Sequence, residues 1–266
     1  MPALLKTLTL GCKVNQYETQ FIREGLIQLG YQQASEDDVA ELCIVNTCTV
    51  THVADRKARQ ALRSARRRNP DATIVVTGCY AERSSEELRG LDDVDVVAGN
   101  GAKATLVKHL AESLDTPPVP CATGSDGPLT ILKLGRNRAM VKIQEGCDQV
   151  CAYCIVPRVR GREQSVPDDV LVRQVARLVD KGAREVVLTG TQLGSYGFEL
   201  PGTNLAAMLK RVLNETGIKR LRVSSLQPAE ITDELLEIWS AEGEGRLCRH
   251  FHMALQSGSD AILSRM

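Results

Sequence analysis

Short apolar runs alternate along the first part of this chain with segments whose apolar residues recur every three or four positions. The apolar runs predict strands at Thr7–Leu10, Leu42–Asn46, Thr73–Thr77 and Val94–Val97. The periodic segments predict helices at Gln16–Leu29, His52–Arg68, Ser84–Leu88 and Ala102–Glu112. Strands that alternate with helices in this order predict an α/β fold, in which helices cover both faces of an open parallel sheet.

A stretch rich in proline, glycine and serine interrupts this pattern at residues 116–130, and it predicts an interdomain linker. A second alternating series follows, with strands predicted at Ala139–Ile143, Glu185–Thr189, Leu221–Ser224 and His250–Leu255. Its helices are predicted at Asp168–Asp180, Asn204–Thr216, Thr232–Ser240 and from near Ser259 onward. Repeated βα units favour a barrel or part of one. We therefore expect domains at residues 1–115 and 131–266.

The charge balance limits how this chain could bind a polyanion. Its 266 residues are 43% hydrophobic and 25% charged, and 33 Lys and Arg balance 33 Asp and Glu. Any nucleic-acid binding must therefore come from a local basic patch. The chain shows neither a secretory signal pattern nor an apolar run of about 20 residues, so we expect a cytoplasmic protein without a membrane span. Nine cysteines in such a chain suggest metal ligation instead of disulfides.

Three of these cysteines, Cys147, Cys151 and Cys154, are spaced C-x3-C-x2-C. Three thiolates on one short loop can hold three corners of a [4Fe–4S] cube and leave the fourth iron without a protein ligand. An open metal position suggests a catalytic loop. A zinc site would need a fourth ligand nearby, and no His or Cys closely follows Cys154. The alternative is a chance cluster of buried thiols or a redox pair.

Three further cysteines, Cys12, Cys48 and Cys79, each follow a predicted strand by about two residues. In a parallel sheet such positions lie together at the carboxyl end. Three loops would then present three thiols to one place, as a second metal cluster requires. The alternative is three unrelated buried thiols. We do not expect the remaining cysteines to bind iron, and they are Cys43, Cys121 and Cys248.

The cysteine loop, with Tyr153 before its last cysteine, resembles the radical S-adenosylmethionine (SAM) enzymes. Motifs along the whole chain resemble the methylthiotransferases within that superfamily. They include Gly11-Cys12-Lys13-Val14-Asn15-Gln16-Tyr17-Glu18, Asn46-Thr47-Cys48-Thr49-Val50-Thr51, Thr77-Gly78-Cys79-Tyr80-Ala81, Cys154-Ile155-Val156-Pro157, Leu188-Thr189-Gly190-Thr191-Gln192 and Gln256-Ser257-Gly258-Ser259-Asp260. The first motif resembles the branch that acts on threonylcarbamoyladenosine in tRNA.

The chain departs from the family at some positions. Ser165-Val166 and Ala254 stand where the family often has Ser-Arg and Pro. A radical-SAM core normally has six βα units and is followed in this family by a small RNA-binding β domain. Only four strands are predicted in the second half of this chain, so we expect an incomplete partial barrel. We also expect the chain to be a fragment of a longer protein, and the fragment to be inactive on its own.

The resemblance implies two [4Fe–4S] clusters, one on each cysteine triad, and SAM as a cofactor, with no catalytic side chain beyond the cluster ligands. It places the SAM site at Gly190, Thr191 and Gln192. An ordinary βα turn would also explain those three residues. We add Tyr153, Ser225 and Gln256 as SAM-binding candidates, although simple packing beside the cluster would explain Tyr153 and helix capping would explain Ser225 and Gln256. It also implies a reduced flavodoxin- or ferredoxin-like electron donor, and we expect a monomer.

Basic residues supply candidate tRNA contacts. Arg158, Arg160 and Arg162 directly follow the cysteine loop, where they could meet substrate. The predicted helix His52–Arg68 has basic residues at positions 56, 59, 63 and 67, which share one face. That stripe could follow tRNA phosphates, or it could be a solvated face whose final arginines complement the helix dipole.

The predicted function is therefore radical-SAM methylthiolation of C2 of N6-threonylcarbamoyladenosine, next to the anticodon in tRNA. Two alternatives stay open. The same chemistry could act on isopentenyladenosine in tRNA or on a ribosomal-protein side chain. The chain could also be a non-enzymatic iron–sulfur binding module.

Overall fold

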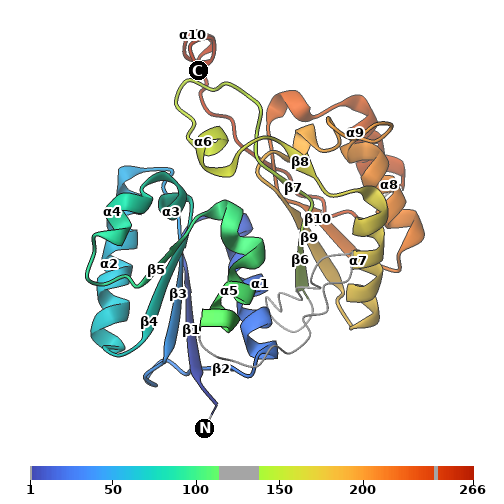
Figure 1. The fold of residues 1–266 in the computed structure, drawn as a ribbon. Helices are drawn as coiled ribbons and strands as arrows, with labels where there is room; N and C mark the ends of the chain where they lie inside the picture. Colours follow the sequence, from blue (N-terminus) through green and yellow to red (C-terminus); the bar gives the residue numbers. More distant parts are fainter. Residues whose placement is uncertain (1, 114–137, 243–244) are drawn as a thin grey trace. The chain divides into compact units, whose positions relative to one another are not determined.

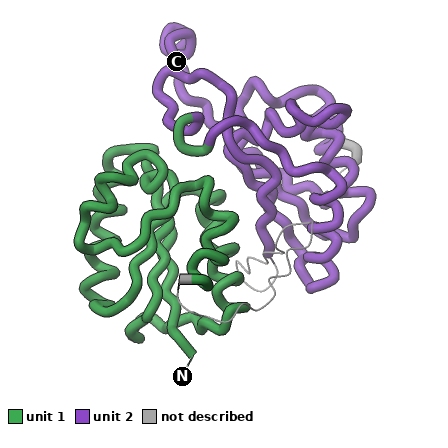
Figure 2. Tube along the Cα trace, in the orientation of Figure 1, with its two compact units in different colours: residues 1–122, 158–160 green, residues 123–157, 161–266 purple. Residues whose placement is uncertain are grey.

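A computed structural model describes residues 2–113, 138–242 and 245–266 of the chain. Two compact units are present (Figure 2). Unit 1 comprises residues 1–122 together with 158–160, and unit 2 comprises residues 123–157 and 161–266. The linker predicted at residues 116–130, with Cys121, lies outside the described residues.

Unit 1 is built on a five-stranded parallel sheet with the strand order β2-β1-β3-β4-β5. The strands are β1 (Leu4–Thr9), β2 (Gln32–Gln33), β3 (Leu42–Thr47), β4 (Thr73–Gly78) and β5 (Val96–Ala98). The parallel α/β architecture confirms the predicted fold class. Strand β2 has only two exposed residues, without an apolar run, and sequence patterning did not predict it.

Helices cover both faces of this sheet, as predicted (Figure 1). Helices α1 (Lys13–Gln28) and α5 (Lys103–Ser113) lie on one face. Helices α2 (His52–Arg68), α3 (Cys79–Arg83) and α4 (Ser85–Arg89) lie on the other. Each face has its own apolar core: Ile22 and Leu26 of α1 pack into the first, and Ala58 and Leu62 of α2 into the second.

Unit 2 contains a three-stranded parallel sheet with the order β10-β9-β6. Its strands are β6 (Arg138–Lys142), β9 (Glu185–Thr189) and β10 (Arg220–Val223), and its main helices are α7 (Asp168–Asp180), α8 (Leu205–Glu215) and α9 (Asp233–Glu237). Helix α8 begins where the Asn204 side chain accepts a hydrogen bond from the Ala207 N–H, as the favoured N-cap residues do.

Short elements complete unit 2. A two-residue hairpin pairs β7 (Gln144–Glu145) with β8 (Gln164–Ser165), and α10 (Asp260–Leu263) follows Ser259 near the last described residue. Helix α6 (Val156–Arg160) spans residues of both units. Among the described residues, no helix has the length and apolar character needed to cross a membrane.

The strand predicted at His250–Leu255 is much shorter in the structure. Only β12 (His252–Met253) forms there, and it pairs with β11 (Ser225–Leu226). Besides β9, strand β10 pairs with residues 246–248: Leu221 bridges Leu247, and the Cys248 N–H donates to the Leu221 carbonyl at 2.8 Å. The pairing is therefore divided between two places, and the apolar pattern of one long strand did not predict this division.

Candidate metal centres

The cysteines of unit 1 lie at one edge of its sheet. Cys12 is the N-cap of α1, Cys48 directly follows β3, and Cys79 is the first residue of α3, directly after β4. Strands β1, β3 and β4 are neighbours and run parallel, so their carboxyl ends bring the three cysteine positions to the same edge. We call Cys12, Cys48 and Cys79 the unit 1 triad.

Two observations indicate that the thiols of this triad are close neighbours. A Cβ added to Gly11 would lie 3.2 Å from the Cys48 Sγ atom, so the chain before Cys12 packs directly on Cys48. Burial raises the pKa of the Cys48 thiol, and the charges of Cys79 and Cys12 raise it further. A cysteine binds a metal as the thiolate. A metal cation at this edge would stabilise the thiolate and lower its pKa, against both of these effects.

Glycine is required where β4 meets the triad. Gly78 has φ of +100°, a conformation that residues with a Cβ rarely adopt. A Cβ there would overlap the carbonyl oxygen of Thr47, on the neighbouring strand. The close approach brings the turn before Cys79 against the turn before Cys48.

Buried side chains tie the three cysteine turns together. Asn15 Nδ2 donates to the carbonyl oxygen of Leu10 at 2.8 Å and to that of Thr47 at 3.0 Å. It thereby joins the turn that precedes Cys12 to the end of β3. Thr47 Oγ1 donates to the Thr77 carbonyl at 2.6 Å, which joins β3 to β4. These bonds fix the spacing of the triad.

Polar side chains around the triad have hydrogen-bonding capacity that the protein does not use. Asn100 Nδ2 lies 3.7 Å from Cys79 Sγ, while Asn100 Oδ1 has no hydrogen-bond partner among the described residues. Asn46 Oδ1 and Thr77 Oγ1 are also unpartnered and buried, and each belongs to the residue two positions before a cysteine. Unsatisfied buried polar atoms are rare in folded proteins, and three of them mark this edge as a site for a group other than protein.

An ion-pair cluster is buried near the same edge. The Lys103 ammonium pairs with Glu18, and both side chains are almost fully buried. Arg160, which belongs to unit 1, pairs with Glu18 at 2.9 Å and also donates to Asn15 Oδ1. Burial lowers the pKa of Lys103, and the Glu18 charge opposes this shift.

The remaining three cysteines, Cys147, Cys151 and Cys154, lie on the loop between β7 and α6, and we call them the unit 2 triad. Cys147 is buried, and the other two are partly exposed. Burial raises the pKa of Cys147, followed by smaller contributions from Glu163 and the other two cysteine charges. The Cys147 thiol therefore lies within electrostatic reach of the other two thiols of its triad.

Gln144 links the unit 2 triad to the loop after β9. This fully buried side chain donates from Nε2 to the Gly146 carbonyl at 2.9 Å. Its Oε1 atom accepts from the backbone N–H groups of Thr191 and Gln192, at 3.0 and 2.8 Å. One side chain thus fixes the start of the cysteine loop against two of the residues predicted to bind SAM.

The loop after β9 also has an unused polar atom and little free space. Thr191 Oγ1 is buried, and no group in the described part of the chain forms a hydrogen bond with it. A Cβ on Gly190 would lie 2.9 Å from the Gln144 carbonyl, so the backbone approaches β7 closely. Gln192 is held between two residues: its Nε2 donates to Glu230, and its Oε1 accepts from Gln227 at 3.1 Å.

The other predicted SAM-binding residues are solvent-accessible. Tyr153 is 56% exposed. Ser225 Oγ lies 2.9 Å from His252 Nδ1 and is in hydrogen-bond contact with it. Gln256 is exposed, and its φ of +63° is the only positive value at a non-glycine position among the described residues. Such strain is concentrated at functional sites in proteins.

The three arginines after the cysteine loop differ from one another. Arg158 is exposed, and the Arg162 side chain is 87% exposed with a loose 3.6 Å pairing to Asp148. The Arg160 side chain is only 3% exposed, and it donates to Glu18 and Asn15. Arg160 thus differs from the predicted substrate contact, because its guanidinium is held inside unit 1 and stabilises the ion-pair cluster.

The donor chemistry of both triads fits iron–sulfur clusters. The eight described cysteines are all free thiols. Within the described residues, no three His, Cys, Asp or Glu side chains converge on a point that could hold a single metal ion. A cube places each thiolate on a different iron, so its three ligands surround a group instead of meeting at one ion.

Asn15, Gln144 and the Glu18–Lys103 pair are site residues that pattern reasoning did not predict. Asn15 and Glu18 belong to the motif around Cys12, and Gln144 lies three positions before Cys147. Their proximity to the cysteines was the available signal. Their roles depend on contacts with residues distant in sequence, such as the 32 positions between Asn15 and Thr47.

Two protein-family models match the chain. Residues 5–99 match the family described as uncharacterized protein family UPF0004, and residues 141–266 match the radical SAM superfamily. The first match contains the unit 1 triad and the second contains the unit 2 triad.

Curated relatives match almost the whole chain. Threonylcarbamoyladenosine tRNA methylthiotransferase MtaB of Aquifex aeolicus is 41% identical over 265 residues, covering 97% of this chain and 64% of that protein. The MtaB protein of Bacillus subtilis is 37% identical, covering 97% and 58%. A tRNA-2-methylthio-N(6)-dimethylallyladenosine synthase of Syntrophobacter fumaroxidans is 36% identical, covering 100% and 60%. The chain thus spans about three fifths of the length of these relatives.

Solved structures show a similar fold. The radical SAM methyltransferase TsrM of Kitasatospora setae, with tryptophan and a SAM analogue bound, aligns with a TM-score of 0.60 at 16% identity, covering 98% of this chain and 61% of that one. The same enzyme with cobalamin and a [4Fe–4S] cluster aligns with a TM-score of 0.57. Both family models and the curated relatives agree with the cysteine pattern: the chain matches the radical SAM superfamily over residues 141–266 and is similar over almost its whole length to the tRNA methylthiotransferases.

Proposed function

We propose that the protein methylthiolates C2 of N6-threonylcarbamoyladenosine, next to the anticodon in tRNA. The observation that carries this proposal is the presence of two cysteine triads in one chain, one at the sheet edge of unit 1 and one on the β7–α6 loop of unit 2. A methylthio transfer needs two functions, one that activates an aromatic carbon and one that holds sulfur, and two clusters can divide them. The MtaB names of the relatives support this substrate.

Cys147, Cys151 and Cys154 would hold the cluster that engages SAM, and Cys12, Cys48 and Cys79 would hold the auxiliary cluster. When bound, a cluster with an open iron supplies the one-electron cleavage of SAM, which produces a radical able to take hydrogen from an aromatic carbon. The protein's part is to position the groups and exclude water. Asn15 and Thr47 hold the unit 1 triad by their hydrogen bonds.

SAM would bind against the loop after β9. The unpartnered Thr191 Oγ1 offers a hydrogen-bonding group, and the lack of a Cβ at Gly190 lets this loop pack directly on Gln144 of β7, which holds the loop in place. Gln192 is oriented by Glu230 and Gln227. Tyr153, Ser225 and the strained Gln256 are the further candidates for contact with SAM.

The reaction consumes electrons, so it needs a reductant of the flavodoxin or ferredoxin class. The exposed Arg158 and Arg162 are candidates for contact with tRNA, whose target base must leave its stack to react. We propose that the protein acts as a monomer in the cytoplasm.

Nucleoside mass spectrometry of tRNA tests this function. In a host strain that lacks the gene, 2-methylthio-N6-threonylcarbamoyladenosine should disappear and its unmodified precursor should accumulate. The complete gene should restore the modification, and a C147A/C151A/C154A variant should not. Unchanged methylthio content in the deletion strain would refute the proposal.

A second candidate substrate is the dimethylallyl form of the same adenosine, because a relative that is 36% identical over the whole chain has that name. The same experiment distinguishes the two. Loss of the methylthio group from dimethylallyladenosine, with the threonylcarbamoyl form unaffected, would replace the first proposal with the second. A methylthio group missing from a ribosomal protein would replace both.

A further inference from the structure

Helix α2 contains an unusual concentration of positive charge. The chain as a whole balances 33 basic against 33 acidic residues. Its 17-residue helix α2 has seven basic residues and one acidic residue, Asp55. Asp55 is buried and paired with Arg83 at 2.9 Å, so it does not neutralise the exposed side of the helix.

The structure divides these basic residues into two sets. Arg59 donates to the Tyr80 hydroxyl at 2.6 Å and pairs with Glu87. Arg66 pairs with Asp95 at 2.6 Å and donates to two backbone carbonyls. These two arginines fasten α2 to the rest of unit 1. The others are exposed and have no ion pair or hydrogen bond within the described residues, and they are Arg56, Lys57, Arg63, Arg67 and Arg68.

Helix energetics do not explain the exposed set. A cation in the last turn is stabilised by the helix dipole, which accounts for Arg67 and Arg68 but not for Arg56, Lys57 and Arg63. Arg63 and Arg67 are four residues apart, so they face each other across one turn and repel. Because no carboxylate of the described residues pairs with them, this repulsion is a cost without an internal benefit.

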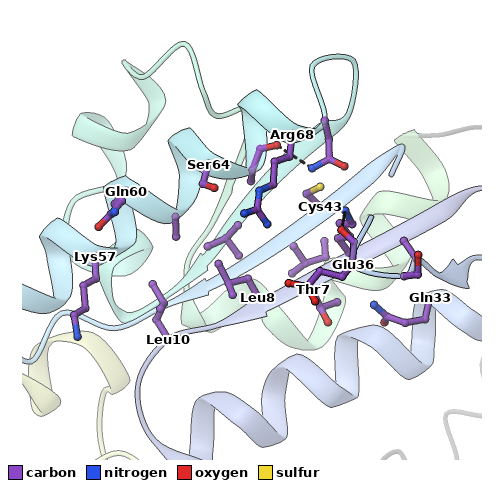
Figure 3. A pocket seen from close by; sticks show the side chains of 18 residues that line it. Thr7, Leu8, Leu10, Gln33, Glu36, Cys43, Lys57, Gln60, Ser64 and Arg68 are labelled. Carbon is purple, nitrogen blue, oxygen red and sulfur yellow. Dashed lines mark hydrogen bonds between the residues drawn. The ribbon is translucent and has the colours of Figure 1, made fainter. Parts of the chain in front are cut away.

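The exposed cations flank two hollows of unit 1. Lys57 and Arg68 lie at opposite ends of one side of a cavity of about 740 Å³, with Gln60 and Ser64 between them (Figure 3). Apolar residues of the sheet, including Leu8, line its other side. Arg63 and Arg67 line a neighbouring hollow with Gln60 and Asp93. The stretch from Arg56 to Arg67 covers about 16 Å along the helix axis.

We propose that Arg56, Lys57, Arg63, Arg67 and Arg68 form a docking surface for the phosphate backbone of the tRNA. This inference rests on the proposed function for the identity of the polyanion. Helix α2 begins four residues after Cys48, so the charged surface runs away from the unit 1 triad. No tryptophan, tyrosine or phenylalanine of α2 is available to stack on a base. The surface thus supplies affinity and orientation, and not sequence readout.

Salt-dependent binding tests the proposal. The complete protein and its R63Q/R67Q variant are titrated with the substrate tRNA at several salt concentrations. Each lost phosphate contact should lower the slope of log K against log salt by about 0.7–0.9, so the double variant should lose between about 1 and 2. The ratio of the wild-type to the variant binding constant should accordingly fall by up to about tenfold between 50 and 200 mM salt. K57Q/R68Q should behave similarly.

The matched control is K181Q/K219Q, which removes two exposed cations of unit 2 that form no side-chain ion pair or hydrogen bond with the part of the chain that the structure describes. It should leave the slope unchanged. The α2 variants should melt at the wild-type temperature or higher, because they relieve like-charge repulsion. They should raise KM for tRNA without lowering kcat.

Three outcomes would overturn the inference. An unchanged slope in both α2 variants would exclude phosphate contacts, and an equal slope loss in the control would show a general charge effect. If the α2 variants bind tRNA normally but accept electrons poorly from a reduced flavodoxin, the surface serves an acidic protein instead. Failure of the wild type itself to bind tRNA would refute the proposed function, and not this surface in particular.

Discussion

Replacing Asn15 with alanine should remove the auxiliary cluster while leaving the other one in place. Asn15 is 1% exposed, and its amide group donates to the carbonyl oxygens of Leu10 and Thr47. Both acceptors lose their partner in N15A. An unsatisfied buried acceptor costs about 1–3 kcal/mol, so two of them should lower the free energy of unfolding by about 2–6 kcal/mol. The turns that contain Cys12 and Cys48 would also lose the bridge between them.

The assay combines denaturant unfolding with iron analysis of anaerobically purified protein. N15A should hold about four irons per chain, against about eight in the wild type, and its remaining cluster should still cleave SAM. Q20A is the matched control, because Gln20 is a buried polar residue of the same helix whose side chain donates to Glu24, one turn away, and to no cysteine turn among the described residues. It should keep about eight irons. An N15A variant with full iron content and wild-type stability would refute this reasoning.

Three further predictions follow from particular contacts. Q144A should lose SAM cleavage and keep the auxiliary cluster, because Gln144 fixes Gly146 against Thr191 and Gln192; normal SAM affinity measured by calorimetry would contradict it. G78A should lose at least about 2 kcal/mol of stability in denaturant unfolding, since Gly78 has φ of +100° and a Cβ would overlap the Thr47 carbonyl. The control variant G202A should lose less stability, because Gly202 has open space around it. Burial raises the pKa of Glu230, so the folded state binds the Glu230 proton more tightly than the unfolded state does, and this group's contribution to stability falls as pH rises. The stability of the wild type relative to E230Q should therefore decline from acid pH toward neutrality. A relative stability that rises with pH would contradict this prediction.

The elements of this fold could be predicted well where local pattern and tertiary structure agree. Helix α2 has the predicted bounds, His52–Arg68, because Thr51 caps it and its apolar residues keep one helical face. Strand β9 and helix α7 also match their predictions. Strand β2 and the division of the last predicted strand did not follow from pattern, because main-chain pairing with distant residues decides them.

For the site, the positions of the cysteines could be predicted from the sequence, but the residues that support them could not. Cysteine spacing and strand ends indicated the positions of both triads, since chemistry of this kind requires those residue types. The supporting residues were not predictable, because Gln144 and Asn15 act through backbone groups far away in sequence. Arg160 illustrates the converse: its position after the cysteine loop suggested substrate contact, and only tertiary structure reveals its buried pairing with Glu18.

Iron and sulfide analysis of cysteine variants tests the central claim most directly. The complete protein, purified without oxygen, should hold about eight irons and eight sulfides per chain, and C12A/C48A/C79A and C147A/C151A/C154A should each hold about four. The six substitutions together should abolish iron binding. If either triple variant keeps the wild-type iron content, the corresponding triad does not hold a cluster, and the account of two centres is wrong.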